Sequence, residues 1–82
     1  MRKVTRRVWL TYPPHLIGEP ILYRANRRFE VETSIRQASV TDQVGIMALE
    51  CRGEPGEIER LWAFFREAGV RVDPVEQDVI AG

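Results

Sequence analysis

The chain of 82 residues contains one cysteine, one lysine and one histidine. Because Cys51 has no partner for an internal disulfide, stability must come from packing, and a reducing, cytoplasmic location is expected. A membrane span needs about 18 or more consecutive apolar residues, and no such run occurs. Neither membrane insertion nor export is expected. This length predicts one domain over 1–82, with a core of about 6–75 and a tail over 76–82.

Catalytic and metal-binding motifs are also missing. No base is paired with a nucleophile and no acid pair stands out, so the chain is expected not to be an enzyme. His15 stands alone in a loop without nearby cysteines or a dense carboxylate cluster, which is a poor basis for a metal site. The turn from Gly53 to Gly56 lacks the Lys-Ser/Thr pair of a phosphate loop. No metal or cofactor is therefore expected.

Charge is balanced overall but uneven along the chain. Residues 1–41 hold eight basic and three acidic side chains, whereas residues 42–82 hold four basic and nine acidic ones. Such a dipole can draw two copies together or steer a charged partner. General nucleic-acid binding needs a surplus of positive charge and, in this type of fold, aromatics on the central strands. The basic residues of the first helix, Arg24, Arg27 and Arg28, are therefore interpreted as a solvated face.

Alternation of apolar and polar residues predicts four strands. They are expected from Arg6 to Tyr12, from Glu30 onward, from about Val44 to Cys51, and from Val70 to Pro74. Residues 41–43 are expected to form a hairpin connection between the second and third strands. Proline has no amide N–H, so Pro74 places the last strand at a sheet edge.

Helical spacing predicts two helices. The first, about residues 20–29, is short, with Ile21, Leu22, Ala25 and Phe29 on one face. The second begins at Pro55 and ends before Gly69, a residue suited to a left-handed helix cap. Its apolar stripe consists of Ile58, Leu61, Trp62, Phe65 and Ala68. Phe64 falls at the edge of this stripe and is a candidate contact residue.

The order strand-helix-strand-strand-helix-strand predicts an α+β, ferredoxin-like βαββαβ two-layer sandwich. Two helices would cover one face of a four-stranded antiparallel sheet and leave the other face open. Strand parity assigns nine residues to this open face: Trp9, Thr11, Ser34, Arg36, Ile46, Ala48, Glu50, Arg71 and Asp73. A polar face with a few apolar members suits a dimer partner or a ligand.

Several segments, in this order and spacing, resemble the NIL domain family from about Val8 to Val75. They are residues 27–31, 34–36, 45–47, 52–55 and 69–72. The resemblance implies a ferredoxin-like domain related to ACT regulatory modules and best known at the C-terminus of the ATPase subunits of methionine ABC transporters. There the domain pairs with a second copy and binds methionine, which inhibits transport. This chain is expected to be a standalone member.

The family takes its name from an Asn-Ile-Leu triplet, and Ser34-Ile35-Arg36 stands in that place here. The resemblance implies a ligand-binding role for the first position, where Ser34 offers a shorter hydroxyl than the amide of asparagine. At the third position Arg36 replaces leucine. Its planar guanidinium can pair with the carboxylate of an amino acid.

Two functional hypotheses follow. The first is a non-enzymatic regulatory domain, acting as a homodimer, that binds a small molecule such as a methionine-like amino acid. Its ligand-binding residues would be Ser34, Arg36, Trp9 and Ile46. The second is a protein–protein interaction module without a small ligand, making contact through an edge strand, the open face or Phe64.

Overall fold

The computed structural model describes residues 2–75, and the expected tail over 76–82 lies outside them. Its elements follow the predicted order, with one additional short 3₁₀ turn in the first loop. They are β1 (Val4–Tyr12), η1 (Pro14–Leu16), α1 (Ile21–Arg28), β2 (Glu32–Val40), β3 (Gly45–Gly53), α2 (Pro55–Ala68) and β4 (Arg71–Pro74).

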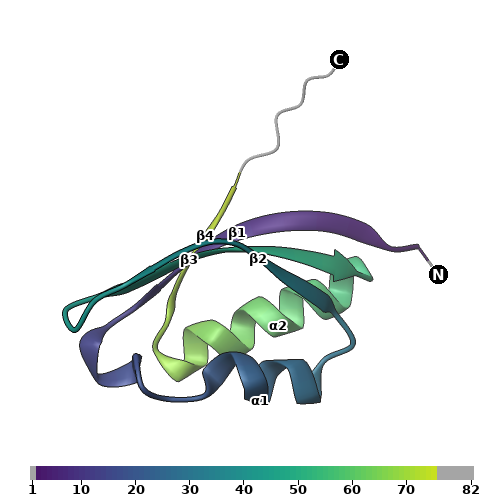
Figure 1. The fold of residues 1–82 in the computed structure, drawn as a ribbon. Coiled ribbons are helices and arrows are strands. Elements are labelled where there is room, and N and C mark those ends of the chain that lie inside the picture. Colours follow the sequence, from purple (N-terminus) through teal and green to yellow (C-terminus); the bar gives the residue numbers. More distant parts are fainter. Residues whose placement is uncertain (1, 76–82) are drawn as a thin grey trace.

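The four strands form one sheet in the order β2-β3-β1-β4, and each neighbouring pair is antiparallel. Both helices lie on the same face of this sheet, and the other face is open (Figure 1). The ferredoxin-like prediction is therefore confirmed. So is the edge position of the last strand, since β4 pairs only with β1 and stops at Pro74.

The core fills the space between the sheet and the two helices. Residues that alternate along β1 and β3 point inward and meet the apolar stripe of α2, as strand and helix periodicity require. Its largest fully buried members are Phe65, Leu10, Leu49, Ile58, Leu61, Val8 and Cys51. The edge strand β2 contributes little: Thr33 and its other residues are half-buried or exposed.

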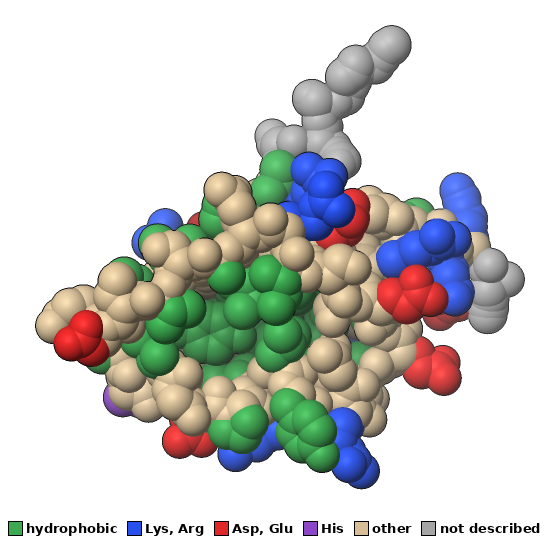
Figure 2. Space-filling model, in the orientation of Figure 1, with side chains coloured by type: hydrophobic (Ala, Val, Ile, Leu, Met, Phe, Trp, Pro, Cys, Tyr) green, Lys and Arg blue, Asp and Glu red, His purple; other side chains and the backbone are tan. Residues whose placement is uncertain are grey.

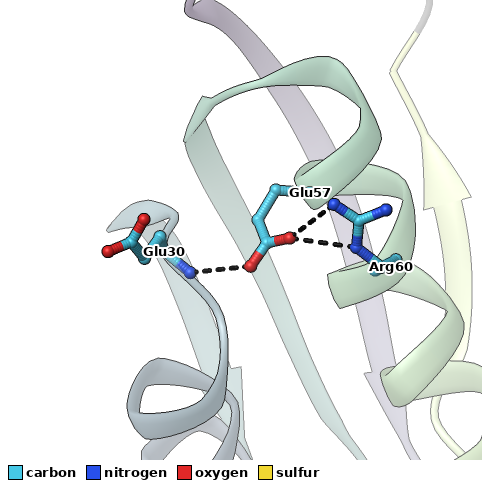
Figure 3. Close-up of polar contacts among 3 residues, drawn as sticks. All are labelled: Glu30, Glu57 and Arg60. Carbon is cyan, nitrogen blue, oxygen red and sulfur yellow. Dashed lines mark hydrogen bonds and ion pairs between the residues drawn. The ribbon is translucent and has the colours of Figure 1, made fainter.

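Both ends of α2 are fixed by local chemistry. Pro55 occupies the first turn, where its missing N–H leaves no bond unmade. Glu57, also in the first turn, accepts a hydrogen bond from the backbone N–H of Glu30 at 3.0 Å and two more from Arg60 (Figure 3). At the other end Gly69 adopts φ 103° and donates its N–H to carbonyl oxygens of the last turn, which confirms the predicted cap.

β1 and β3 are both longer than predicted, because their ends continue to pair with each other. β1 begins at Val4 rather than Arg6, and Val4 pairs with Gly53 at the end of β3. The turn expected over residues 53–56 is correspondingly reduced to Glu54, which precedes the first helical residue. Within residues 2–75 neither helix has the length and apolar character needed to cross a membrane.

Phe64 has a packing role that the sequence did not indicate. Its ring lies edge-on to Phe29 and Phe65, with ring centroids 5.7 and 6.1 Å away. The guanidinium of Arg28 lies 5.7 Å from the centre of the same ring. Phe64 thus joins the end of α1 to α2, and only part of its surface is left for an external contact.

Candidate functional site

A β-bulge at Arg36 shapes the open face. Ser34 pairs with Glu50, but Gln37, three residues later, pairs with Ala48, only two residues from Glu50 on β3. Arg36 is therefore the extra residue of β2. A bulge of this kind re-aims side chains, and the alternation of β2 reverses after it. As a result Gln37 joins the open face, a position that uninterrupted parity does not give.

Arg36 belongs to a cluster of charges that spans three strands. The carboxylate of Glu50 on β3 lies 3.6 Å from a terminal nitrogen of Arg36 and 3.5 Å from Nε of Arg7 on β1. We call these three residues the Glu50 cluster. Two guanidinium groups share one carboxylate, so the cluster has an excess of one positive charge. Because each guanidinium has five N–H donors, it retains capacity for another anion.

Trp9 adds an apolar surface beside this cluster. It pairs with Ala48 on β3 and Asp73 on β4, two residues along β1 from Arg7, and 37% of its surface is exposed. An aromatic ring next to paired arginines suits a ligand with a carboxylate and an apolar side chain.

The four predicted site residues do not form a single group. Ser34 and Arg36 lie at the Glu50 cluster, and Trp9 adjoins it. Ile46 lies opposite Thr11, four positions along β3 from Glu50, which corresponds to about 13 Å along a strand. It borders a hollow near the hairpin. The structure thus associates Ile46 with a second surface feature.

That feature, which we call the α1 hollow, lies between the hairpin end of the sheet and α1, and its volume is about 170 Å³. Figure 2 shows hydrophobic side chains gathered in it. Its lining includes Tyr12, Ile17, Leu22, Tyr23, Val40 and Met47. The hollow is mostly apolar and adjoins the free edge of β2.

Sequence reasoning left Arg7 and Gln37 out of the site. Arg7 shares the parity of Trp9, so its position on the open face was available from the alternation of β1. Its link to Arg36 depends on the register of three strands. Gln37 could not have been found in this way, because the bulge that turns it arises from pairing with β3.

Other reactive residues do not gather around these surfaces. His15 is exposed on η1, and among residues 2–75 no three His, Cys, Asp or Glu side chains are arranged to hold a metal ion. Burial raises the pKa of the Cys51 thiol, an effect opposed by the nearby indole N–H of Trp62 and assisted by the charge of Glu50. A buried thiol with a raised pKa is a poor nucleophile.

Comparisons with known proteins place these features in a family context. The NIL domain family matches residues 6–74. The methionine import ATP-binding protein MetN 1 of Bacillus licheniformis is 34% identical over 62 residues, which cover 71% of this chain and 19% of that protein. The chain thus spans about a fifth of the length of this relative. In fold, it is similar to the C-terminal domain of an ABC transporter ATP-binding protein from Enterococcus faecalis, with a TM-score of 0.76 and 19% identity over 89% of this chain and 86% of that one.

Proposed function

Because the chain belongs to the NIL domain family, we propose that it is a non-enzymatic regulatory domain that binds an amino-acid-like ligand and acts as a homodimer in the cytoplasm. The name of the Bacillus licheniformis relative, a methionine import protein, makes methionine the first candidate ligand. Nothing catalytic is required of such a domain: a bound ligand changes the equilibrium between two states by its difference in affinity for them.

The observation that carries this proposal is the unbalanced charge of the Glu50 cluster. A ligand carboxylate would lie between Arg7 and Arg36, where both guanidinium groups already face Glu50. Its side chain would lie toward Trp9, and Ser34 would offer a hydroxyl at the neighbouring position on β2. An exposed ion pair is worth only about 0–1 kcal/mol, so a ligand can compete for these arginines at small cost.

Calorimetry tests the proposal. We expect methionine, or another apolar amino acid in the same panel, to release heat with the wild-type protein. Arg36→Leu and Arg7→Gln should each weaken binding by at least about tenfold, since a charged hydrogen bond contributes roughly 1.5–3 kcal/mol. Arg71→Gln is the matched control, because Arg71 pairs with Asp73 on the open face of β4. Absence of heat at millimolar ligand, or equal binding by all variants, would contradict the proposal.

The second candidate function is an interaction module without a small ligand. It is favoured by the α1 hollow and the exposed edge of β2, which adjoin one another and together offer more contact surface than an amino acid covers. In that case the variants of the Glu50 cluster would show no ligand-dependent difference, and association would be the measurable property.

A further inference from the structure

The indole of Trp9 lies on the open face of the sheet beside a very small residue. Trp9 pairs with Ala48 across β1 and β3, so their side chains are neighbours on this face. Ala48 lies outside the core cluster between the sheet and the helices, yet only 9% of its surface is exposed. Its neighbours on the open face therefore cover it, and Trp9 is the largest of them. The single methyl group of Ala48 lets the indole lie close to the sheet.

The outward side of this indole is free. Trp9 is 37% exposed. Among residues 2–75, the stacking and cation–π contacts all involve the rings of Tyr23, Phe29, Phe64 and Phe65, and none of them involves Trp9. Neither another ring nor a guanidinium group therefore covers it in this part of the chain. We call the outward face of this indole the Trp9 platform, a flat apolar surface on which a planar group can stack.

The Trp9 platform and the Glu50 cluster are about one amino acid apart. Trp9 follows Arg7 by two residues on β1, which corresponds to about 7 Å on the same face. In an aromatic amino acid a few bonds of about 1.5 Å each separate the carboxylate from the ring centre, about 5 Å in total. One ligand can therefore place its carboxylate at the arginines of the cluster and its ring over Trp9.

Stacking distinguishes a planar ring from other apolar side chains. A pair of stacked rings gains about two- to tenfold in affinity beyond the burial of apolar area. An aliphatic side chain gains from burial alone. The sulfur of methionine does contact aromatic rings, but most often at the ring edge. Because the indole of Trp9 lies over Ala48 and exposes its face, the platform favours a ring.

We infer that the ligand of this domain is an aromatic amino acid, whose carboxylate binds between Arg7 and Arg36 and whose ring stacks on Trp9. This inference rests on the proposed function and narrows its ligand class. Ala48 acts as a positioning residue, because a larger side chain there would lift the indole away from the sheet. Phenylalanine is accordingly expected to bind more tightly than methionine.

Two ligands that differ only in their rings test the stacking. Phenylalanine and cyclohexylalanine have the same carbon skeleton and the same carboxylate, but only phenylalanine has a planar aromatic ring. Cyclohexylalanine is the more apolar of the two, so burial alone would favour it. We expect the wild-type protein to bind phenylalanine about two- to tenfold more tightly than cyclohexylalanine, as measured by calorimetry. Methionine in the same series should also bind more weakly than phenylalanine.

Variants of Trp9 and Ala48 test the platform separately. Trp9→Leu removes the ring, so phenylalanine should lose its advantage over cyclohexylalanine, and Trp9→Phe should recover part of it. Ala48→Leu keeps the indole but displaces it, and should reduce the same advantage while the arginines remain. Tyr23→Leu removes an aromatic side chain that is 59% exposed on α1, so it is the matched control and should change neither affinity. Circular dichroism of each variant checks that the fold is retained.

The fluorescence of Trp9 gives a second readout at the site itself. The chain has two tryptophans, and Trp62 is only 4% exposed. Phenylalanine does not absorb at the wavelength that excites tryptophan, and a ring stacked on Trp9 shields the indole from water. Adding phenylalanine should therefore move the emission to shorter wavelength. This shift should persist in Trp62→Phe and disappear in Trp9→Leu.

The outcomes separate this inference from the ligand proposal. Equal or tighter binding of cyclohexylalanine, tighter binding of methionine, or a preference for phenylalanine that survives Trp9→Leu would each overturn the aromatic ligand. In these cases the ligand proposal stands if Arg36→Leu still weakens binding. Absence of heat with every amino acid in the series at millimolar concentration would remove both.

Discussion

The backbone N–H of Glu30 donates a hydrogen bond of 3.0 Å to Oε2 of Glu57, and this bond ties the segment after α1 to the first turn of α2 (Figure 3). This hydrogen bond lowers the pKa of the Glu57 carboxyl, and the contacts of Arg60 lower it further. A group with a lowered folded-state pKa stabilises the protein above its unfolded-state pKa. That stabilisation is lost as the pH falls through the folded-state pKa.

Glu57→Gln is therefore expected to lower the urea midpoint at neutral pH. The difference from the wild type should shrink as the pH falls below about 4.5, the ordinary value for this carboxyl. Urea unfolding of both proteins at a series of pH values measures this difference in midpoint. Glu67→Gln, the same change near the other end of α2, is the control and should have little effect. A constant difference between Glu57→Gln and the wild type at every pH would contradict the role of the Glu57 charge.

A side chain at Gly69 would be unfavourable for two reasons: the backbone is left-handed there, and a neighbouring side chain is close. Its φ is 103°, and an added Cβ would lie 3.1 Å from Cδ1 of Leu16. Gly69→Ala should destabilise the fold by at least about 1–2 kcal/mol, the cost of a left-handed conformation for an L-residue. Gly18→Ala is the control, since its Cβ would have no atom within 4 Å. Equal urea midpoints for the two variants would refute this explanation.

The fold could be predicted from the sequence because a strand or helix that is buried on one face has apolar residues at a regular spacing. Val8 and Leu10 lie two residues apart on β1 and are both buried, and the apolar stripe of α2 follows the helical repeat. The local sequence of each of these elements therefore shows which of its faces points to the core. The sequence of the edge strand β2 showed less clearly which of its faces points to the core. Its positions Ile35 and Val40 are apolar but exposed, and the bulge between them reverses the alternation.

The candidate site was only partly readable, for a related reason. Strand parity placed Arg36 and Glu50 on one face, but the contact between them and Arg7 depends on register, which a single strand does not contain. The α1 hollow depends on how a short helix crosses the sheet. Its apolar residues come from the first loop, α1 and the hairpin, so no local pattern in the sequence marks it.

Cys51 should be chemically silent in the folded protein. It is fully buried, and burial raises the pKa of its thiol. We expect a thiol reagent to label it only at the rate at which the protein unfolds. Cys51→Ser should cost about 1–3 kcal/mol, because it buries a hydroxyl among apolar side chains. Cys51→Ala, which adds no polar group, should cost less than Cys51→Ser. Rapid labelling under native conditions would contradict this burial.

Variants of Phe64 distinguish a role in packing from a role in binding a partner. Its contacts with Phe29, Phe65 and Arg28 hold α1 against α2, so Phe64→Ala should destabilise the protein by about 1–3 kcal/mol, less than for a fully buried phenylalanine. Phe64→Leu should recover part of this loss, because it restores apolar volume. Both variants should bind ligand as the wild type does when folded, since Phe64 lies on α2 and the Glu50 cluster lies on the strands. Unchanged stability together with lost association would instead identify Phe64 as a contact residue.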